Sequence, residues 1–343
     1  MPSAQRIFIN GKFLSQKATG VQKFAVGISL ALQKEHPNMV VLVPRGKFSF
    51  QGLQVRQSKW CSGFIWEQIG LPLFLLFHKK ALLINLCNSA PLLYRNQVVT
   101  IHDLAFLKNK QWFSNSFRLW YQFLIPRLCN KSMAILTVSD FIKKEIINRF
   151  SILSDKITVV HNGIPLMEYD AQKPYSFKYL LLTGIYNPRK NAALVLSLMP
   201  QIKKMGYHIV GVGADSGIFK DAFLKEENHL HLLAYVDDKA YYTLMKHASA
   251  LVFPSEYEGF GIPVLEALTL ETPVIVPDLP VYRESFGELP IYYTAMDADS
   301  FLKQLPKIGN EQYQKKDALH LKNKFNFDVS AKMISEILIL HKK

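Results

Sequence analysis

Two glutamates, Glu258 and Glu266, stand eight residues apart around a loop that suits a ligand with both phosphate and hydroxyl groups. Gly259 and Gly261 let the backbone approach a ligand closely, and Pro263 is well placed to open a helix, whose free amides favour a phosphate. Two carboxylates would repel that phosphate unless they bind sugar hydroxyls, since one carboxylate accepts two O–H bonds at once. Taken singly, each glutamate is better explained as a helix-start or loop carboxylate.

Arg189 and Lys190 are adjacent cations between the apolar run 179–183 and the helical pattern 192–205. A diphosphate group is negatively charged, and an Arg fork together with a Lys point charge would stabilise it. With these cations and the helix start present, we expect no metal ion and no cofactor. A solvated Arg-Lys pair in a loop is the alternative.

In the first half of the chain, His102 follows the apolar run 98–101, at the strand end where α/β proteins bind ligands. Its imidazole could donate to a sugar hydroxyl, or it could be a capping or core histidine. Gly20 lies in a loop between the first expected strand and helix, although turns use single glycines freely.

Three other patterns carry no catalytic prediction. Gly211-Val212-Gly213 follows a strand, but Ser216 replaces the third glycine of a dinucleotide-binding fingerprint. Asp297-Ala298-Asp299 resembles a metal-binding motif, yet it precedes a helical pattern, and helix capping explains it better. Asp237 likewise is predicted to start a helix.

Short apolar runs that alternate with amphipathic segments must position these residues. The pattern predicts two successive doubly wound α/β units with parallel sheets covered on both faces. The expected strands are 6–10, 40–43, 82–86, 98–101, 134–138, 158–160, 179–183, 208–212, 230–232, 250–253 and 274–276. The expected helices are 22–34, 117–128, 140–148, 192–205, 238–247, 263–270 and 329–340.

The length of 343 residues favours two domains, and a Gly/Pro-containing polar stretch at 163–175 marks their join. We predict an N-terminal domain at 1–168, a C-terminal domain at 169–328, and a helix in 329–343 that packs back on the N-terminal domain. Because open α/β sheets bind ligands at the carboxyl ends of their strands, the site is expected in the cleft between the domains.

The stretch from Glu258 to Glu266 resembles the signature of the family-4 retaining glycosyltransferases, which have the GT-B fold of two Rossmann-like domains. The resemblance extends over nearly the whole chain. It implies that Glu258 lies by the donor sugar and that Glu266 binds the ribose diol of the nucleotide. The backbone amides of Gly259, Phe260 and Gly261 would contact the sugar and the diphosphate.

The same resemblance gives the remaining candidates their roles. Arg189 and Lys190 match the diphosphate clamp of the family, but Ile185 stands where many members carry an arginine, and Arg189 is expected to substitute for it. His102 would reach a hydroxyl of the donor sugar, and Gly20 would face the donor phosphates.

The net charge of +14 is unevenly placed, because residues 1–170 hold 21 basic and 8 acidic residues, a balance of +13. This favours an anionic surface or substrate, either phosphates or acidic lipid head groups. The segment 66–73 beside His78-Lys79-Lys80 suits insertion at a lipid interface, with a buried helix end equally plausible. No module for binding nucleic acid is recognisable.

Three widely spaced cysteines argue against a disulfide scaffold and against a zinc site. The N-terminus does not resemble a signal peptide, and the apolar tract 71–77 falls short of the roughly 20 residues that a bilayer span requires. We therefore expect a cytoplasmic protein, peripheral on the inner face of the plasma membrane.

The resulting prediction is a retaining hexosyltransferase that moves a sugar from a nucleoside-diphosphate donor to a glycan or lipid-linked acceptor. Mannose is favoured because the stretches at 102–104 and 188–191 resemble bacterial surface-polysaccharide mannosyltransferases. The alternatives are a sugar-nucleotide epimerase or hydrolase of the same fold, and a non-catalytic basic membrane adaptor.

Overall fold

The structure is a computed structural model that describes residues 6–16, 19–46, 52–58, 61–78, 80–213, 229–234, 236–309 and 315–340. The chain divides into two compact units. Unit 1 comprises Met1–Pro165 together with Phe325–Lys343, and unit 2 comprises Leu166–Lys324. Each unit is described by itself.

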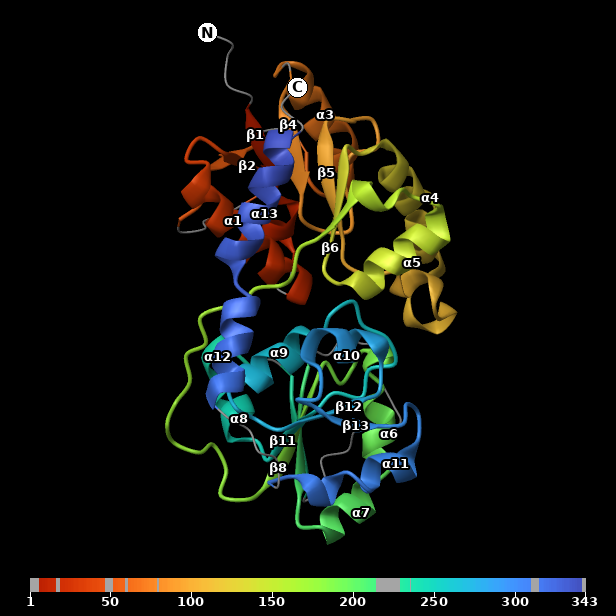
Figure 1. The fold of residues 1–343 in the computed structure, drawn as a ribbon, viewed down its shortest axis with the longest axis vertical. Coiled ribbons are helices and arrows are strands. Elements are labelled where there is room, and N and C mark those ends of the chain that lie inside the picture. The colour runs from red at the N-terminus through yellow and green to blue at the C-terminus, as the bar shows by residue number, and fades with distance from the viewer. Residues whose placement is uncertain are drawn as a thin grey trace. The chain divides into compact units, whose positions relative to one another are not determined.

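Unit 1 is built on a parallel sheet with the strand order β3-β2-β1-β4-β5-β6-β7 (Figure 1). The central strands are buried at every position, as expected for a sheet that helices cover on both faces. The strands are β1 (Ile7–Asn10), β2 (Val40–Val43), β3 (Val55–Gln57), β4 (Leu82–Asn85), β5 (Gln97–Ile101), β6 (Ala134–Thr137) and β7 (Ile157–Val159).

The helices of unit 1 begin at caps that the sequence supplies. Thr19 and Gln22 form a capping box at the start of α1, and Ser139 accepts a hydrogen bond from the backbone of Ile142 at the start of α5. The main helices are α1 (Gly20–Glu35), α2 (Gly63–Ile65), α3 (Leu71–Leu76), α4 (Asn115–Lys131), α5 (Asp140–Phe150) and α13 (Phe327–Leu340), and a π-helical turn, Trp66–Gly70, joins α2 to α3.

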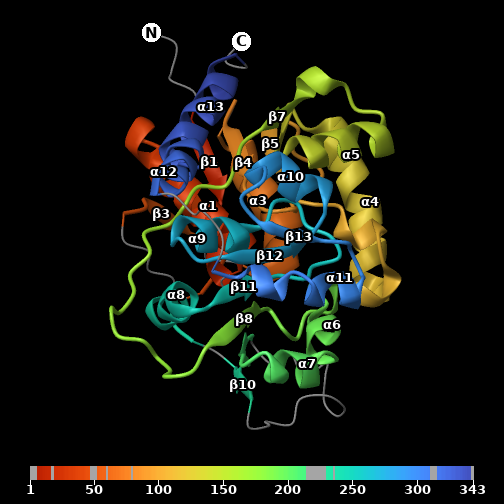
Figure 2. The same cartoon turned by 60° about the horizontal axis from the view of Figure 1, so that its bottom comes forward.

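The last helix, α13, belongs to unit 1 and lies along α1 (Figures 1 and 2). The ring of Phe327 fills the space beside two glycines, because a Cβ atom on Gly27 or on Gly163 would lie 2.4 Å from it. Ser330 Oγ donates to the carbonyl oxygen of His161 at 2.8 Å. Helix α13 is thereby part of the core of the first unit.

Unit 2 has a second parallel sheet, with the order β10-β9-β8-β11-β12-β13 (Figure 2). Its strands are β8 (Tyr179–Thr183), β9 (His208–Val212), β10 (Leu230–Leu233), β11 (Ala250–Val252), β12 (Val274–Pro277) and β13 (Ile291–Tyr293). Its helices are α6 (Ala192–Leu196), α7 (Met199–Lys204), α8 (Asp238–His247), α9 (Ile262–Thr269), α10 (Pro280–Phe286), α11 (Ala298–Leu302) and α12 (Lys315–Lys324).

The two sheets have the same order of their first four strands. In each, the first strand of the unit stands inside the sheet, the next two strands extend to one side, and the fourth strand pairs on the other side. The direction of winding therefore reverses between β1 and β4 in unit 1 and between β8 and β11 in unit 2. Ligands of open α/β sheets bind beside such switch points, at the carboxyl ends of the strands. The prediction of two doubly wound α/β units is confirmed.

Several local predictions fail at the sheet edges and in one helix. Two edge strands, β3 and β13, were not predicted from the sequence. β3 has the sequence Val-Arg-Gln and therefore lacks the continuous apolar run of a buried strand, whereas β13 is apolar throughout but only three residues long. The expected helix 192–205 is two helices, α6 and α7, and Pro200 stands at the start of the second.

The expected helix caps at two aspartates are confirmed. The side chain of Asp237 accepts a hydrogen bond from Ala240 N at 2.8 Å, and that of Asp297 accepts one from Ser300 N at 2.9 Å.

Candidate functional site

The loops that follow β8 and β11 bring two cations and a carboxylate together at the switch point of unit 2. Arg189 and Lys190 lie in a short 3-10 turn, where the side chain of Asn187 accepts from the backbone of Arg189. Glu258 lies in the loop before α9. Arg189 Nη1 and Lys190 Nζ each lie 2.6 Å from Glu258 Oε1. Because β8 and β11 are parallel neighbours, their loops emerge side by side.

Further contacts fix both cations in this position. Arg189 Nη1 also donates to the carbonyl oxygen of Tyr257, and the backbone of Glu256 donates to that of Arg189 at 3.0 Å. Lys190 Nζ lies 4.1 Å from the ring centre of Phe253, a cation–π distance. The two positive charges are therefore held before any ligand arrives.

The cations also determine the charge of Glu258, whose residue is 8% exposed. Burial acts to raise the pKa of this carboxyl group, but the charges and hydrogen bonds of Arg189 and Lys190 outweigh burial and lower the pKa to about 2. Glu258 is therefore ionised at neutral pH. It can accept hydrogen bonds or stabilise positive charge, and it cannot serve as a proton donor.

Glu266 lies on α9 and is only 2% exposed. Its Oε1 accepts a hydrogen bond from the hydroxyl of Tyr242 at 3.0 Å. Burial and the nearby Glu266 charge raise the pKa of Tyr242, so this hydroxyl keeps its proton. One carboxylate oxygen of Glu266, the residue expected to bind the ribose, thus already accepts a hydrogen bond from within the protein.

The loop between the glutamates contributes backbone rather than side chains. Gly261 has φ +103°, and a Cβ atom there would lie 2.8 Å from the ring of Tyr282, so the position requires glycine. The ring of Phe260 is buried and packs edge-to-face against the ring of Phe286, with 5.7 Å between the ring centres. Gly259 and Phe260 can therefore meet a ligand only through backbone atoms.

Ile185, at the place where the family pattern has arginine, is buried in the core of unit 2. It packs against two glycines, since Cβ atoms on Gly211 and Gly213 would lie 3.1 Å from Ile185 atoms. These glycines make room for an apolar side chain beside β8. No cation stands at this position, and Arg189 is the guanidinium that reaches Glu258.

In unit 1, His102 is buried, and its ring is held edge-on to Phe24, with 4.9 Å between ring centres. Nε2 donates to the carbonyl oxygen of Leu86 at 2.8 Å, and the backbone nitrogen donates to Asn88 Oδ1 at 2.6 Å. Burial lowers the pKa of His102, which keeps the ring neutral at pH 7. Because Nε2 donates to Leu86, a sugar hydroxyl would meet Nδ1, which in the neutral ring can only accept a hydrogen bond. This differs from the prediction that the imidazole donates to the sugar.

The candidates thus fall into two sets. Arg189, Lys190 and Glu258 are in direct contact, with the Gly259–Gly261 loop and Glu266 following in the same unit. Gly20, the first residue of α1, and His102 belong to unit 1. Among the described residues, no group of three or more His, Cys, Asp or Glu side chains is placed to hold a metal ion.

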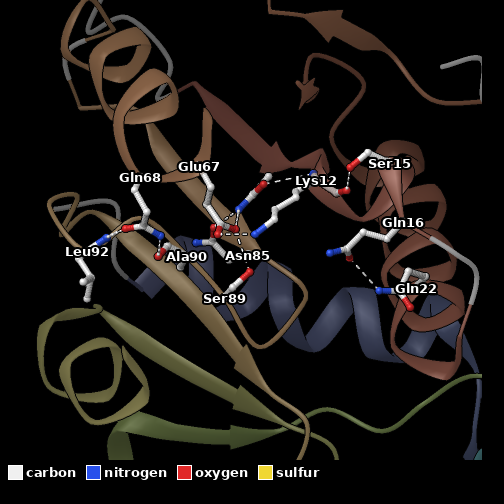
Figure 3. Close-up of polar contacts among 11 residues, drawn as sticks. Lys12, Ser15, Gln16, Gln22, Glu67, Gln68, Asn85, Ser89, Ala90 and Leu92 are labelled. Carbon is white, nitrogen blue, oxygen red and sulfur yellow. Dashed lines mark hydrogen bonds and ion pairs between the residues drawn. The ribbon is translucent and has the colours of Figure 1, made fainter. Parts of the chain in front are cut away.

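A polar cluster that was not predicted from the sequence lies at the switch point of unit 1, where Lys12 contacts Glu67 (Figure 3). From the sequence, Glu67 is predicted only as part of a segment that inserts at a lipid interface or forms a buried helix end. Asn10 and Asn85, each the last residue of an apolar strand, were the signal that could have revealed it. Buried polar residues at strand ends point to a network rather than to a membrane-facing surface.

In comparisons with known proteins, each half of the chain matches a family model of glycosyltransferases. Residues 19–168 match the family model described as Glycosyltransferase Family 4, and residues 169–323 match the model described as Glycosyl transferases group 1. O-antigen chain mannosyltransferase RfbU of Salmonella typhimurium is 28% identical over 299 residues, which cover 83% of this chain and 80% of the relative. O-antigen chain mannosyltransferase B of Escherichia coli is 27% identical over 225 residues, 59% of this chain and 58% of the relative.

Solved structures share the fold over nearly the full length. Sucrose-phosphate synthase from Thermosynechococcus elongatus has a TM-score of 0.74 at 15% identity and covers 98% of each chain. WaaG, a glycosyltransferase involved in lipopolysaccharide biosynthesis, has a TM-score of 0.69 at 15% identity and covers 96% of this chain and 98% of its own. At such identities the likeness concerns the fold alone.

Proposed function

The chain belongs to glycosyltransferase family 4 and has the GT-B fold, and from this premise we propose a specific reaction. The enzyme transfers a hexose, with mannose favoured, from a nucleoside-diphosphate sugar to a glycan or lipid-linked acceptor in the biosynthesis of a surface polysaccharide. The convergence of Arg189 and Lys190 on Glu258 is the observation that carries this proposal. Two relatives named O-antigen chain mannosyltransferases support the choice of sugar and of product.

The charges at the switch point of unit 2 suit the departure of a diphosphate. Two cations and one ionised carboxylate leave a net charge of one positive unit, which attracts phosphate oxygens. As the bond from the anomeric carbon to the phosphate oxygen breaks, negative charge grows on the leaving group near Arg189 and Lys190. The Glu258 carboxylate then faces the positive charge that develops on the sugar.

We further propose that the reaction retains the anomeric configuration. The departing phosphate accepts the proton of the acceptor hydroxyl, whose oxygen forms the new bond on the same face of the sugar. Glu258, which is ionised, has no proton to give to this exchange. The cations supply the charge stabilisation for which other enzymes use a metal ion, and we propose that this enzyme requires none.

The other candidate residues keep the roles that the family resemblance implies. Glu266 accepts hydrogen bonds from the ribose diol, and the backbone amides of Gly259, Phe260 and Gly261 bind the sugar and diphosphate. In unit 1, His102 meets a hydroxyl of the donor sugar and Gly20 faces the phosphates.

A screen of nucleotide sugars tests the proposal directly. Each donor is added to the enzyme, and the shift in melting temperature is measured; GDP-mannose is expected to give the largest stabilisation, since a ligand that binds only the folded state raises stability. Transfer is then assayed with and without a mannose-containing acceptor. Release of free sugar into water at the same rate in both conditions would support a hydrolase instead.

An apolar face of unit 1 supports a second proposal, contact with an anionic membrane surface. Ile69, Leu73, Leu76 and Phe77 are 56%, 46%, 69% and 86% exposed. The opposite face of the same helical segment, with Leu71, is buried in the core. The segment therefore has a buried face, which fits the buried helix end expected as one alternative, and an exposed apolar face, which supports the proposal of a lipid contact.

Charge around this face is complementary to acidic lipids. Residues 61–81 and 113–131, which include α2, α3 and α4, contain one carboxylate, that of Glu67, and it is buried. Phe64 of α2 contacts Trp120 of α4 edge-on at 4.9 Å between ring centres, and Arg127 of α4 lies over Phe123. Exposed apolar side chains beside cations are typical of proteins that lie in a membrane interface.

We propose that the enzyme binds peripherally to the inner face of the plasma membrane, where a lipid-linked acceptor would be met. Of the helices in the described parts of the chain, none combines the length and the hydropathy that crossing a bilayer demands. Lys79, one of the two lysines expected at this surface, lies outside the described residues.

A further inference from the structure

The switch point of unit 1 holds a buried polar cluster that none of the roles above uses. We call it the Lys12–Glu67 cluster. Glu67 lies in the π-helical turn Trp66–Gly70 and is 1% exposed. Its Oε2 accepts from Lys12 Nζ at 2.7 Å, and its Oε1 accepts from Asn10 Nδ2 at 3.1 Å and from Ser89 Oγ at 2.8 Å (Figure 3).

Neighbouring strands hold this cluster at the carboxyl edge of the sheet. Asn10 ends β1 and Asn85 ends β4, and Asn10 Nδ2 donates to Asn85 Oδ1 at 2.9 Å. Asn85 Nδ2 in turn donates to Gln97 Oε1 at 3.0 Å, at the start of β5. Buried amides and carboxylates are costly unless they are hydrogen-bonded, so this chain of contacts fixes Glu67 in one position.

The loop after β4 connects the cluster with His102. Leu86 and Asn88 hold the imidazole and the backbone nitrogen of His102, and Ser89 donates to Glu67. One short loop therefore positions both the candidate sugar-binding histidine and the cluster. The two lie on the same edge of the sheet, following β5 and β1.

The cluster is poorly explained as a device for stability. A buried ion pair loses much of its attraction to the cost of removing both charges from water, and apolar replacements are often as stable. Lys12 remains 20% exposed at its side chain, and Glu67 is the recorded partner of Nζ among the described residues. An ammonium group has three donors, so two remain for a ligand.

The net charge of the cluster identifies the class of ligand. Lys12 and Glu67 cancel each other, whereas the switch point of unit 2 carries two cations for one carboxylate. A phosphate would gain little from a neutral pair. A sugar hydroxyl, which accepts from an ammonium group and carries no charge, suits it better.

We propose that the Lys12–Glu67 cluster is a subsite for an uncharged acceptor sugar. Lys12 Nζ donates to a hydroxyl oxygen of the sugar, and Glu67 is a positioning residue that holds Lys12 at the edge of the sheet. The proposal rests on the glycosyltransferase function proposed above, because it treats the bound sugar as the acceptor.

The test uses the full chain and a double variant, Lys12→Met/Glu67→Gln, which removes both charges without leaving either buried and unpaired. Lys12→Met alone would strand the Glu67 carboxylate and is avoided for that reason. The probes are a panel of neutral disaccharides of mannose, galactose and N-acetylglucosamine, and, separately, inorganic pyrophosphate. Lys34→Met, which breaks an exposed ion pair with Asp328 in the same unit, is the matched control.

We expect the double variant to bind the best disaccharide at least about tenfold more weakly, since hydrogen bonds to a charged group are lost. Pyrophosphate affinity should stay unchanged, and Lys34→Met should match the unmodified chain in both titrations. In transfer assays, Glu67→Gln should raise the KM for acceptor about threefold or more and leave kcat and the KM for donor unchanged, a split that a purely structural role would not produce.

Unchanged disaccharide affinity in the double variant would overturn the proposal, as would failure of the unmodified chain to bind any disaccharide of the panel. Equal losses for disaccharide and pyrophosphate would place the cluster in donor binding and overturn it too. Disaccharide binding that depends on Lys12, with no transfer from any nucleotide sugar, would instead refute the proposed function and leave the subsite standing.

Discussion

Lys190 and Glu258, 68 residues apart in the chain, meet as ammonium and carboxylate with 2.6 Å between Nζ and Oε1. Arg189 contacts the same oxygen. Each cation thus already has an ionic partner, and under the proposed function the phosphate oxygens of the donor would share Arg189 and Lys190 with Glu258. The proposed chemistry depends on this sharing. The attraction of Arg189 and Lys190 to the diphosphate increases as the leaving group gains negative charge, so these contacts are stronger in the transition state than in the ground state.

Acid should unfold the protein partly through Glu258. Its pKa is about 2 in the folded state against an ordinary 4.5, so its contribution is complete above pH 4.5 and disappears as the pH falls toward 2. A lowered pKa of this size corresponds to roughly 3 kcal/mol of unfolding free energy. Urea unfolding at pH 7 and pH 3 should show Glu258→Gln losing less stability between these conditions than the unmodified chain. Asp299→Asn, at an exposed carboxylate of unit 2, should retain the unmodified pH dependence, and an identical profile for Glu258→Gln would contradict the assignment.

Lys190→Met should reduce turnover more than donor binding, because its partner charge increases in the transition state. Loss of one such contact typically costs about 10²-fold in kcat. Stopped assays give kcat, and calorimetry with the donor gives its Kd. Lys239→Met, which removes an exposed lysine paired with Asp170 in the same unit, serves as the control and should change neither. A loss of donor affinity that accounts for the whole effect would argue against this role.

Glu266→Ala should weaken binding of the donor nucleotide by about 1–3 kcal/mol through lost hydrogen bonds to a charged group. Calorimetry with the nucleoside diphosphate measures this directly. Tyr242→Phe removes the hydroxyl that Glu266 accepts from and leaves the carboxylate in place, so it should preserve affinity. Should Glu266→Ala bind the nucleotide as tightly as the unmodified chain, its ribose role is wrong.

The full chain should co-sediment with anionic vesicles, be released by high salt, and leave neutral vesicles unbound. Exposed charges are screened over about 8 Å at physiological ionic strength, and each Lys or Arg near an anionic surface contributes roughly 1 kcal/mol. Leu76→Glu should reduce binding, as should Lys79→Glu combined with Lys80→Glu. Leu153→Glu, at a leucine of unit 1 that is 74% exposed outside the apolar segment, should bind normally. Equal binding to anionic and neutral vesicles, or no binding to either, would contradict the proposed contact with an anionic membrane surface.

The sequence by itself determined most of the strands and helices and indicated the family. The apolar runs at 40–43, 179–183 and 208–212 are strands with those same bounds, because a buried parallel strand requires a continuous apolar run. The spacing from Glu258 to Glu266 indicated the family, since a strand end, two glycines and a helix start are all local features. Features that depend only on residues close together in the chain can be identified from the sequence.

Only the tertiary structure decided which distant residues meet. Arg189 reaches Glu258 because β8 pairs with β11 on one side, while β9 pairs with β8 on the other side and β10 lies beyond β9. Lys12 reaches Glu67, 55 residues away, because β1 pairs with β4 and a π-helical turn directs Glu67 into the sheet edge. From the sequence, Glu67 is one acid in an apolar helix. In the structure its carboxylate has three polar partners, Asn10, Lys12 and Ser89, which come from two separate segments of the chain. Periodicity encodes which face of an element is buried, but the strand order that brings two loops together is a property of the whole packed sheet.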